Sequence, residues 1–302
     1  MPNANFKYYL HLHFLVFIAG FTAILGELIS IGSLPLVWYR MLIAGILMFI
    51  FIKIVKLNLK VTRHLLFKFG IAGILIALHW ITFFEAINQA NVSIALAMFS
   101  SGAFFASFIE PIVFNRRLLW FEILLGFIVI IGVYYITSGE LNYINGIFLG
   151  LSSALFSTLF AVINGRFIQN HRASVISFYE FVSGVLFLSL FIALFGDGFN
   201  ASFFDLVIQD WVYIAILATV CTAYAFIAVV DVMKYISPYT VILSYNLEPV
   251  YGIALALLIF PEKEQMSSRF YIGALLVISA VIVDGILKNY NGRRIKSKTK
   301  PN

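Results

Sequence analysis

The sequence predicts an all-α polytopic membrane protein with ten transmembrane helices, arranged as two inverted five-helix repeats. Three observations predict this class: the composition, the length of the apolar runs, and a pattern that occurs once in each half. Of the 302 residues, 62% are hydrophobic and only 11% are charged, whereas about 25% charged residues are usual in a soluble domain. The composition therefore excludes an ordinary soluble protein.

The apolar runs are long enough to form transmembrane helices. Residues 87–109, 141–165 and 211–230 contain no charged side chain, and each exceeds or matches the roughly 20 residues that cross a hydrocarbon core about 30 Å thick. The longest connections between apolar runs are too short for a catalytic domain outside the bilayer. Charged residues, glycines and prolines divide the chain into ten predicted spans, at residues 10–31, 35–53, 68–88, 92–114, 118–137, 146–165, 174–195, 209–231, 238–260 and 269–287.

The basic residues are concentrated in every second connection between spans, which predicts the orientation of the chain in the membrane. If the amino terminus is inside, the inner segments hold all of the 20 basic residues except Arg40, Lys263 and Arg269. Cytoplasmic loops carry such an excess of lysine and arginine. We therefore expect a multi-pass protein of the cell inner (plasma) membrane with both termini cytoplasmic. The net charge of +6 is explained by this placement and does not indicate a nucleic-acid partner.

A pattern in the first half recurs in the second. Residues 90–93 precede an apolar helix, a charged corner and Leu125-Gly126, and residues 236–239 precede the same succession up to Ile272-Gly273. With five spans per half, the two halves must have opposite orientations. The loops agree, because residues 53–68 are basic whereas the counterpart contains acidic residues and no Lys or Arg. Inverted repeats with a midplane site are a transporter architecture. We expect repeats at residues 1–138 and 139–290, followed by a basic cytoplasmic tail at 291–302.

The predicted ninth span contains Glu248 near its centre. A carboxylate there costs roughly 3 kcal/mol on insertion scales, so such residues usually face a bundle interior or a watery cavity. Pro249 predicts a kink, and helical spacing places Tyr245, Glu248 and Gly252 on one face. We predict that Tyr245, Asn246 and Glu248 bind substrate and that Pro249 and Gly252 form a kink or gate. The structural alternative is an interhelical hydrogen-bond clamp.

Opposite charges occupy related places in the second and seventh spans. Arg40 follows Trp38-Tyr39, and the corresponding Phe178-Tyr179 is followed by Glu180. The planar guanidinium of Arg40 suits a substrate carboxylate or phosphate. The alternative is an arginine that reaches the lipid headgroups or backbone carbonyls. Tyr179 and Glu180 are predicted to join the same substrate site.

The third and fourth spans add further candidates. His79 is suited to a proton relay or to donation to substrate, although a structural hydrogen bond would also satisfy it. Trp80 is too deep for an interfacial aromatic belt and predicts a cavity wall or core packing. The repeat relates Ser100 and Ser101 to the region of Glu248, so we predict that they also bind substrate. The alternative is that these small residues allow two helix backbones to approach closely. Pro111 is a second candidate kink.

The sequence contains no catalytic or nucleotide-binding motif. It has no phosphate-binding loop of the GxxxxGK[ST] type, no HExxH, no GxSxG and no Cys/His cluster with metal-ligand spacing. We therefore predict no enzyme activity, no cofactor and no metal site, and this argues against ATP-driven pumping. Two alternatives remain: an intramembrane lipid-modifying enzyme that uses His79 and Glu248 as base and acid, and a lipid flippase.

Several segments resemble the EamA family of the drug/metabolite transporter superfamily, over essentially the whole chain. The resemblance rests on residues 20–45 (GFTAILGELISIGSLPLVWYRMLIAG), residues 79–97 (HWITFFEAINQANVSIALA) and residues 246–264 (NLEPVYGIALALLIFPEKE), followed by FYIGALLVISAVIV. It implies a ten-helix, inverted-repeat carrier with cytoplasmic termini that exports amino acids or similar small metabolites. The expected partners are a small-molecule substrate and the lipid bilayer, with proton or ion coupling, oligomeric state and substrate identity left open.

Overall fold

A computed structural model describes residues 2–298, apart from residues 116, 234, 237–240 and 242–243. The side chains of residues 2–5, 230 and 288–298 lie outside the description. The described residues form helices and contain no strand, as the composition predicts. The helices are α1 (Pro2–Leu28), α2 (Ser33–Ile54), α3 (Arg63–Gln89), α4 (Val92–Phe99), α5 (Gly102–Phe114), α6 (Trp120–Gly139), η1 (Leu141–Tyr143), α7 (Ile144–Phe167), α8 (Ala173–Phe195), α9 (Ala201–Phe204), α10 (Ile208–Ala218), the π-helix η2 (Thr219–Tyr224), α11 (Ala225–Val232), α13 (Glu248–Ile259) and α14 (Ser268–Lys298).

Nine helical segments among the described residues are long and apolar enough to cross a membrane. They overlap nine of the predicted spans, and the shorter α13 lies on the predicted span 238–260. Residues 238–240 and 242–243 of that span lie outside the described residues. The segments are 6–28, 33–54, 63–89, 92–114, 120–139, 141–167, 173–195, 208–229 and 268–287.

Two of these segments are interrupted where the sequence predicts continuous helices. The predicted span 92–114 breaks at Ser100 and Ser101 into α4 and α5. The predicted span 209–231 changes from α-helix to the wider π-helix at Thr219–Tyr224. Both serine hydroxyls donate to backbone carbonyls of the preceding turn, at Leu96 and Met98. Such bonds give the backbone an alternative to regular helix.

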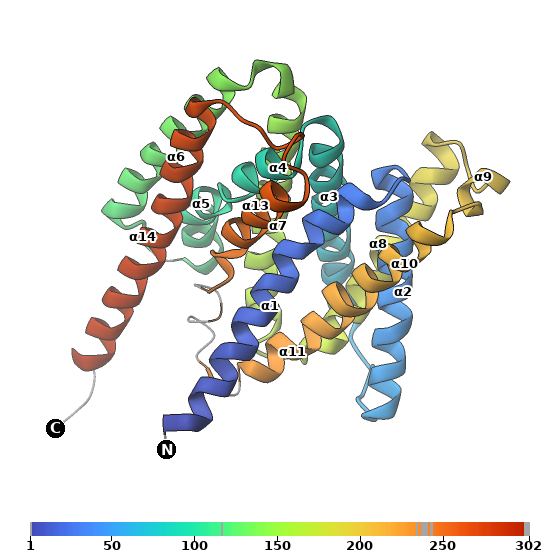
Figure 1. The fold of residues 1–302 in the computed structure, drawn as a ribbon. Coiled ribbons are helices and arrows are strands. Elements are labelled where there is room, and N and C mark those ends of the chain that lie inside the picture. The colour runs from blue at the N-terminus through green and yellow to red at the C-terminus, as the bar shows by residue number, and fades with distance from the viewer. Residues whose placement is uncertain (1, 116, 234, 237–240, 242–243, 299–302) are drawn as a thin grey trace.

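The start of α1 and the end of α14 lie at the same end of the bundle (Figure 1). We call this end the termini side and the opposite end the far side. Helix α14 extends into the predicted tail 291–302, as far as Lys298. Helix α2 runs antiparallel to α8, because the Tyr179 hydroxyl at the start of α8 donates to the Leu59 carbonyl just beyond α2, at 2.6 Å. Near the other ends, Trp38 Nε1 donates to Ser189 Oγ at 2.8 Å.

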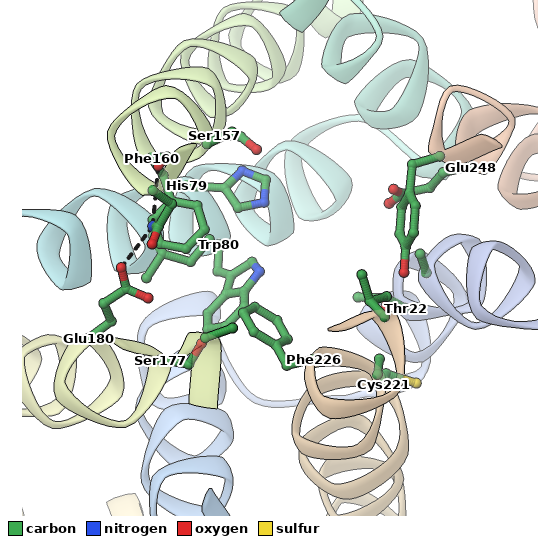
Figure 2. Close-up of a pocket in the computed structure, with 18 of the residues that line it drawn as sticks. Thr22, His79, Trp80, Ser157, Phe160, Ser177, Glu180, Cys221, Phe226 and Glu248 are labelled. Atoms are coloured by element: carbon green, nitrogen blue, oxygen red, sulfur yellow. Dashed lines mark hydrogen bonds between the residues drawn. The ribbon is translucent and has the colours of Figure 1, made fainter. Parts of the chain in front are cut away.

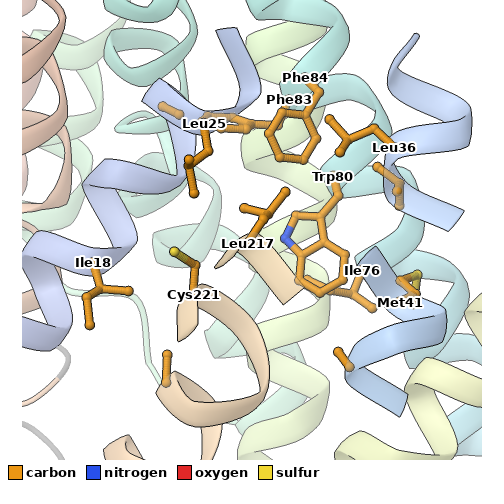
Figure 3. Close-up of a cluster of buried hydrophobic side chains, with 14 of the residues drawn as sticks. Ile18, Leu25, Leu36, Met41, Ile76, Trp80, Phe83, Phe84, Leu217 and Cys221 are labelled. Carbon is orange, nitrogen blue, oxygen red and sulfur yellow. The ribbon is translucent and has the colours of Figure 1, made fainter. Parts of the chain in front are cut away.

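Helices from the two halves of the chain pack on each other throughout the bundle. The closest associations join α6 with α14, α3 with α7 and α8, α2 with α8, and α1 with α13. The largest apolar cluster is drawn in Figure 3, where Trp80 lies near Ile76 and Met41 on one side and Leu217 on another. Because this cluster surrounds the centre of the bundle, it fixes the helices that line the site described next.

Candidate functional site

A cavity of about 460 Å³ lies in the middle of the bundle. Its volume falls within the roughly 300–1,000 Å³ of small-molecule sites. The lining begins near Thr22 and Phe83 and continues to Ile168 and Met233, at the termini-side ends of α7 and α11. In Figure 2, His79 and Glu180 lie on one side of this space and Glu248 and Thr22 on the other. We call it the central cavity.

Arg40 comes from α2 and is 3% exposed. Its Nε donates to the hydroxyl of Thr222 at 2.8 Å, and its Cζ lies 3.9 Å from the ring centroid of Trp80. Its Nη1 is buried without a hydrogen-bond partner. No ion pair joins Arg40 to a described acidic side chain. The side chain is therefore a buried cation at the cavity wall with part of its hydrogen-bonding capacity unused.

Glu248 lies at the first turn of α13, after a turn at Asn246 and Leu247. The sequence predicts a kink at Pro249 inside a continuous span, whereas Pro249 occupies the first turn of a helix that begins beside the cavity. In that position a missing backbone N–H breaks no helical hydrogen bond. Glu248 and Tyr245 both line the central cavity. The break before Glu248 and the break at Ser100 and Ser101 lie at positions that the sequence repeat is expected to relate, and discontinuous helices form the sites of many transporters.

His79 and Glu180 are each held by a neutral partner on α7. His79 Nδ1 lies 2.8 Å from the Ser153 hydroxyl and 3.1 Å from the Ser153 carbonyl oxygen. Glu180 is 1% exposed, and its Oε1 accepts from Asn164 Nδ2 at 2.7 Å. The His79 ring also stacks on Phe99, with 5.2 Å between centroids. These contacts fix both side chains at the cavity wall.

The structure brings together six of the predicted substrate residues and places the others elsewhere. Those that line the central cavity are Arg40, His79, Trp80, Glu180, Tyr245 and Glu248. A second cavity of about 720 Å³, on the termini side between α5, α7, α13 and α14, is lined by Ser100, Asn246 and Pro249, and it shares Glu248 and Tyr245 with the first.

The remaining predicted residues line neither cavity. Ser101 is buried in the α4–α5 break, and Tyr179 contacts Leu59. Gly252 packs against Gly20 of α1, where an added Cβ would lie 3.2 Å from the Gly20 carbonyl oxygen. Pro111 lies inside α5.

Sequence reasoning missed several residues of the site. Asn164, Ser157, Thr22 and Cys221 line the central cavity. Thr222 does not line the cavity, but its hydroxyl accepts a hydrogen bond from Arg40. Each is a small or neutral polar residue within an apolar span. Such residues are common in membrane helices, so the sequence alone does not distinguish those that meet a charged partner.

The EamA-like transporter family matches two segments of the chain, residues 7–138 and 144–283. Together they cover most of its length. The chain belongs to this family. A multi-pass membrane protein with a central cavity is consistent with the transporters that the family name describes, and the expected resemblance is confirmed.

Comparison with solved structures supports the fold of this EamA-like chain. A crystal structure matches with a TM-score of 0.63, covering 93% of this chain and 98% of the other. At 15% sequence identity, the likeness concerns the fold alone. No curated protein matches the chain.

Proposed function

We propose that this EamA-like chain is a secondary transporter that exports amino acids or similar small metabolites by alternating access around the central cavity. The observation that carries the proposal is the presence of Arg40 and Glu248 in one cavity without an ion pair between them. Buried charges are usually paired. A ligand with a carboxylate and an ammonium group would supply a counter-charge to each.

The walls between these charges are largely apolar. Trp80, Phe83, Phe99, Phe160 and Phe226 line the same cavity, and aromatic faces bind apolar groups. A small amphipathic zwitterion therefore fits better than a bulky polyanion. The contact of His79 is with Ser153, so no described hydrogen bond joins His79 to Glu248 as an acid–base pair of an intramembrane enzyme would require.

Ten helices in two inverted repeats, divided near residue 138, are part of the proposal. The helix pairs support it, because α2 and α8 hold the same place in each half and are antiparallel. Helices α6 and α14 are related in the same way: the backbone N–H of Ser267, just before α14, donates to Glu140, just after α6, at 2.7 Å. An axis in the membrane plane makes equivalent helices antiparallel, whereas an axis along the membrane normal makes them parallel. In this arrangement α13, together with the residues before it, is the ninth span.

We place the termini side in the cytoplasm. All of the described basic residues in the connections except Lys263 lie there, and the positive-inside rule requires such an excess. In a Cys221→Ser background, a thiol introduced at Asn58 should react with an impermeant reagent from the cytoplasm only, and one at Ala201 from the outside only. Both positions are exposed. The opposite labelling would refute this orientation.

The energy source is a substrate or ion gradient, because the sequence has no nucleotide-binding loop. Uptake into proteoliposomes with an imposed pH gradient distinguishes proton coupling from uniport. Strict dependence on ATP would exclude the secondary mechanism. Metabolite profiling of the medium, from cells with and without the gene, identifies the substrates to be tested.

Glu248→Gln tests the substrate site directly. The change keeps the size of the side chain and removes its charge, so the protein should insert and fold while transport falls at least about tenfold, as expected if a charge-assisted contact of roughly 1.5–3 kcal/mol is lost. The matched control is Glu262→Gln, the same chemical change at an exposed position outside both cavities. A Glu248→Gln protein that transports at the parental rate would show that the carboxylate is structural.

A further inference from the structure

The guanidinium of Arg40 is restrained on two sides. The indole ring of Trp80 lies against its plane, with Cζ 3.9 Å from the ring centroid, which is a cation–π arrangement. The Nε edge is occupied by the Thr222 hydroxyl at 2.8 Å. Nη1 is left without a partner, although the side chain is almost completely buried and lines the central cavity. Because Arg40 lines the central cavity and Nε is its hydrogen-bonded nitrogen, the Nη side of the guanidinium is the side left for a group in the cavity.

Thr222 is itself fixed by the backbone of the π-helix. Its hydroxyl donates to the carbonyl of Leu217, five residues earlier, at 2.8 Å, and the side chain is completely buried. A hydroxyl has one hydrogen to donate. Because that hydrogen goes to Leu217, the oxygen faces Arg40 as an acceptor only. Thr222 does not line the cavity, so it acts on a ligand only through Arg40.

We propose that Thr222 is a positioning residue, which turns the free side of the Arg40 guanidinium toward the carboxylate of the transported molecule. The π-helix is what makes this possible, because its wider turn allows a hydroxyl to bond a carbonyl five residues back. Single π-turns inside α-helices are frequent at functional sites. The inference rests on the proposed function and extends it to a residue outside the cavity.

The geometry specifies the chemical class of the ligand group. With Nε bonded to Thr222 and Trp80 packed against the guanidinium, the Nη edge is the hydrogen-bonding side left for an incoming group. The N–H groups of this edge point in the plane of the guanidinium, and a carboxylate accepts hydrogen bonds there. An ammonium group is repelled there and is left to Glu248. The position of Thr222 should therefore affect binding of the carboxylate and leave binding of the amine unchanged.

Three ligands with the same ring test this selectivity: L-phenylalanine, 3-phenylpropionate without the ammonium group, and phenethylamine without the carboxylate. Binding of labelled L-phenylalanine to the purified full-length protein, with the other two as competitors, gives an affinity for each. Thr222→Val should lower the affinities for L-phenylalanine and 3-phenylpropionate at least about tenfold. The affinity for phenethylamine should stay within about twofold of the parent value. Thr222→Ser keeps the hydroxyl and should bind like the parent.

Thr219→Val is the matched control, because Thr219 lies in the same π-helix, donates to the Ala215 carbonyl at 2.6 Å and does not contact Arg40. If Thr222→Val does not fold, Thr222→Ala replaces it, since alanine also lacks the hydroxyl that holds Nε; the same selective loss is expected. If the parent protein binds phenylalanine and these variants bind all three ligands unchanged, the inference is overturned. A parent protein that binds none of the three overturns the proposed substrate class as well.

Discussion

At the scale of single residues, Glu264 shows how a charged side chain is used structurally in this bundle. Its two carboxylate oxygens accept from the backbone N–H groups of Val92 at 3.1 Å and Ser93 at 3.0 Å, and it is 1% exposed. Asn91 accepts from Ile94 in the same turn. The first N–H groups of a helix have no partner within the helix. Glu264 therefore stabilises the start of α4 from the other half of the chain.

Glu264→Gln should destabilise the protein without changing its substrate preference. An amide offers one oxygen where two N–H groups need acceptors, and leaving one of them unsatisfied costs about 1–3 kcal/mol. The measurement is the midpoint of thermal unfolding in detergent. Glu262→Gln, at the exposed neighbouring acid, should leave that midpoint unchanged. Equal midpoints for the two variants would contradict the capping role.

At the scale of helices, α6 and α14 pack with their backbones in close approach. A Cβ added at Gly132 would lie 2.8 Å from the carbonyl oxygen of Gly273 and 2.7 Å from a methyl group of Val277. In return, a Cβ at Gly273 would lie 2.5 Å from the carbonyl oxygen of Gly132. Small residues at helix crossings allow this approach in membrane proteins. Since a backbone carbonyl cannot rotate away, any side chain here must separate the two helices.

Gly132→Ala should therefore lower stability by about 1–3 kcal/mol, the usual cost of overpacking. The same substitution at Gly32 is the control, because a Cβ there would meet only Pro35 Cδ at 3.8 Å. Yield of monodisperse protein and its unfolding temperature, compared for the two variants, check the prediction. If Gly132→Ala is as stable as Gly32→Ala, the close approach of α6 and α14 is wrong.

At the scale of the whole molecule, the far side is joined by contacts between the two halves of the chain. Asp210 accepts from the backbone N–H of Ser30 at 2.8 Å and from its hydroxyl at 2.6 Å. Lys263 donates to Glu27 at 2.7 Å. The central cavity, by contrast, continues to the termini-side ends of α7 and α11. For the cavity to open to the far side, these contacts must break.

Titration of Lys263 does not break its pair with Glu27 near neutral pH. The hydrogen bond to Glu27 and the charge of Glu27 raise the pKa of Lys263 above its ordinary value. A lysine whose pKa is raised in the folded state contributes stability below the unfolded pKa of about 10.4, and loses it only as the pH rises further. The ammonium group is also largely exposed, so the pair contributes at most about 1 kcal/mol.

Asp210→Asn should shift the protein toward opening at the far side, because an amide replaces the charged acceptor of both Ser30 bonds. Cys221, the one cysteine of the sequence, lines the central cavity and reports on this change. In the parent protein an impermeant thiol reagent should reach Cys221 mainly from the termini side, and in the variant its far-side reaction should increase several-fold. Cys221→Ser controls for background labelling. An unchanged ratio would show that these contacts do not hold the far side closed.

The sequence by itself determined the class of the molecule and most of its helices, because the cost of placing polar groups in hydrocarbon acts on every residue of a span. It also placed Glu248 and Arg40 inside spans, where a charge indicates a site. The tertiary structure decided which polar groups meet: Arg40 with Thr222, and Glu180 with Asn164. It also decided that the fourth span breaks at Ser100 and Ser101 and that the eighth contains a π-turn. Which side chains meet depends on the packing of helices distant in the chain, and the apolar pattern of one span carries no information about its neighbours.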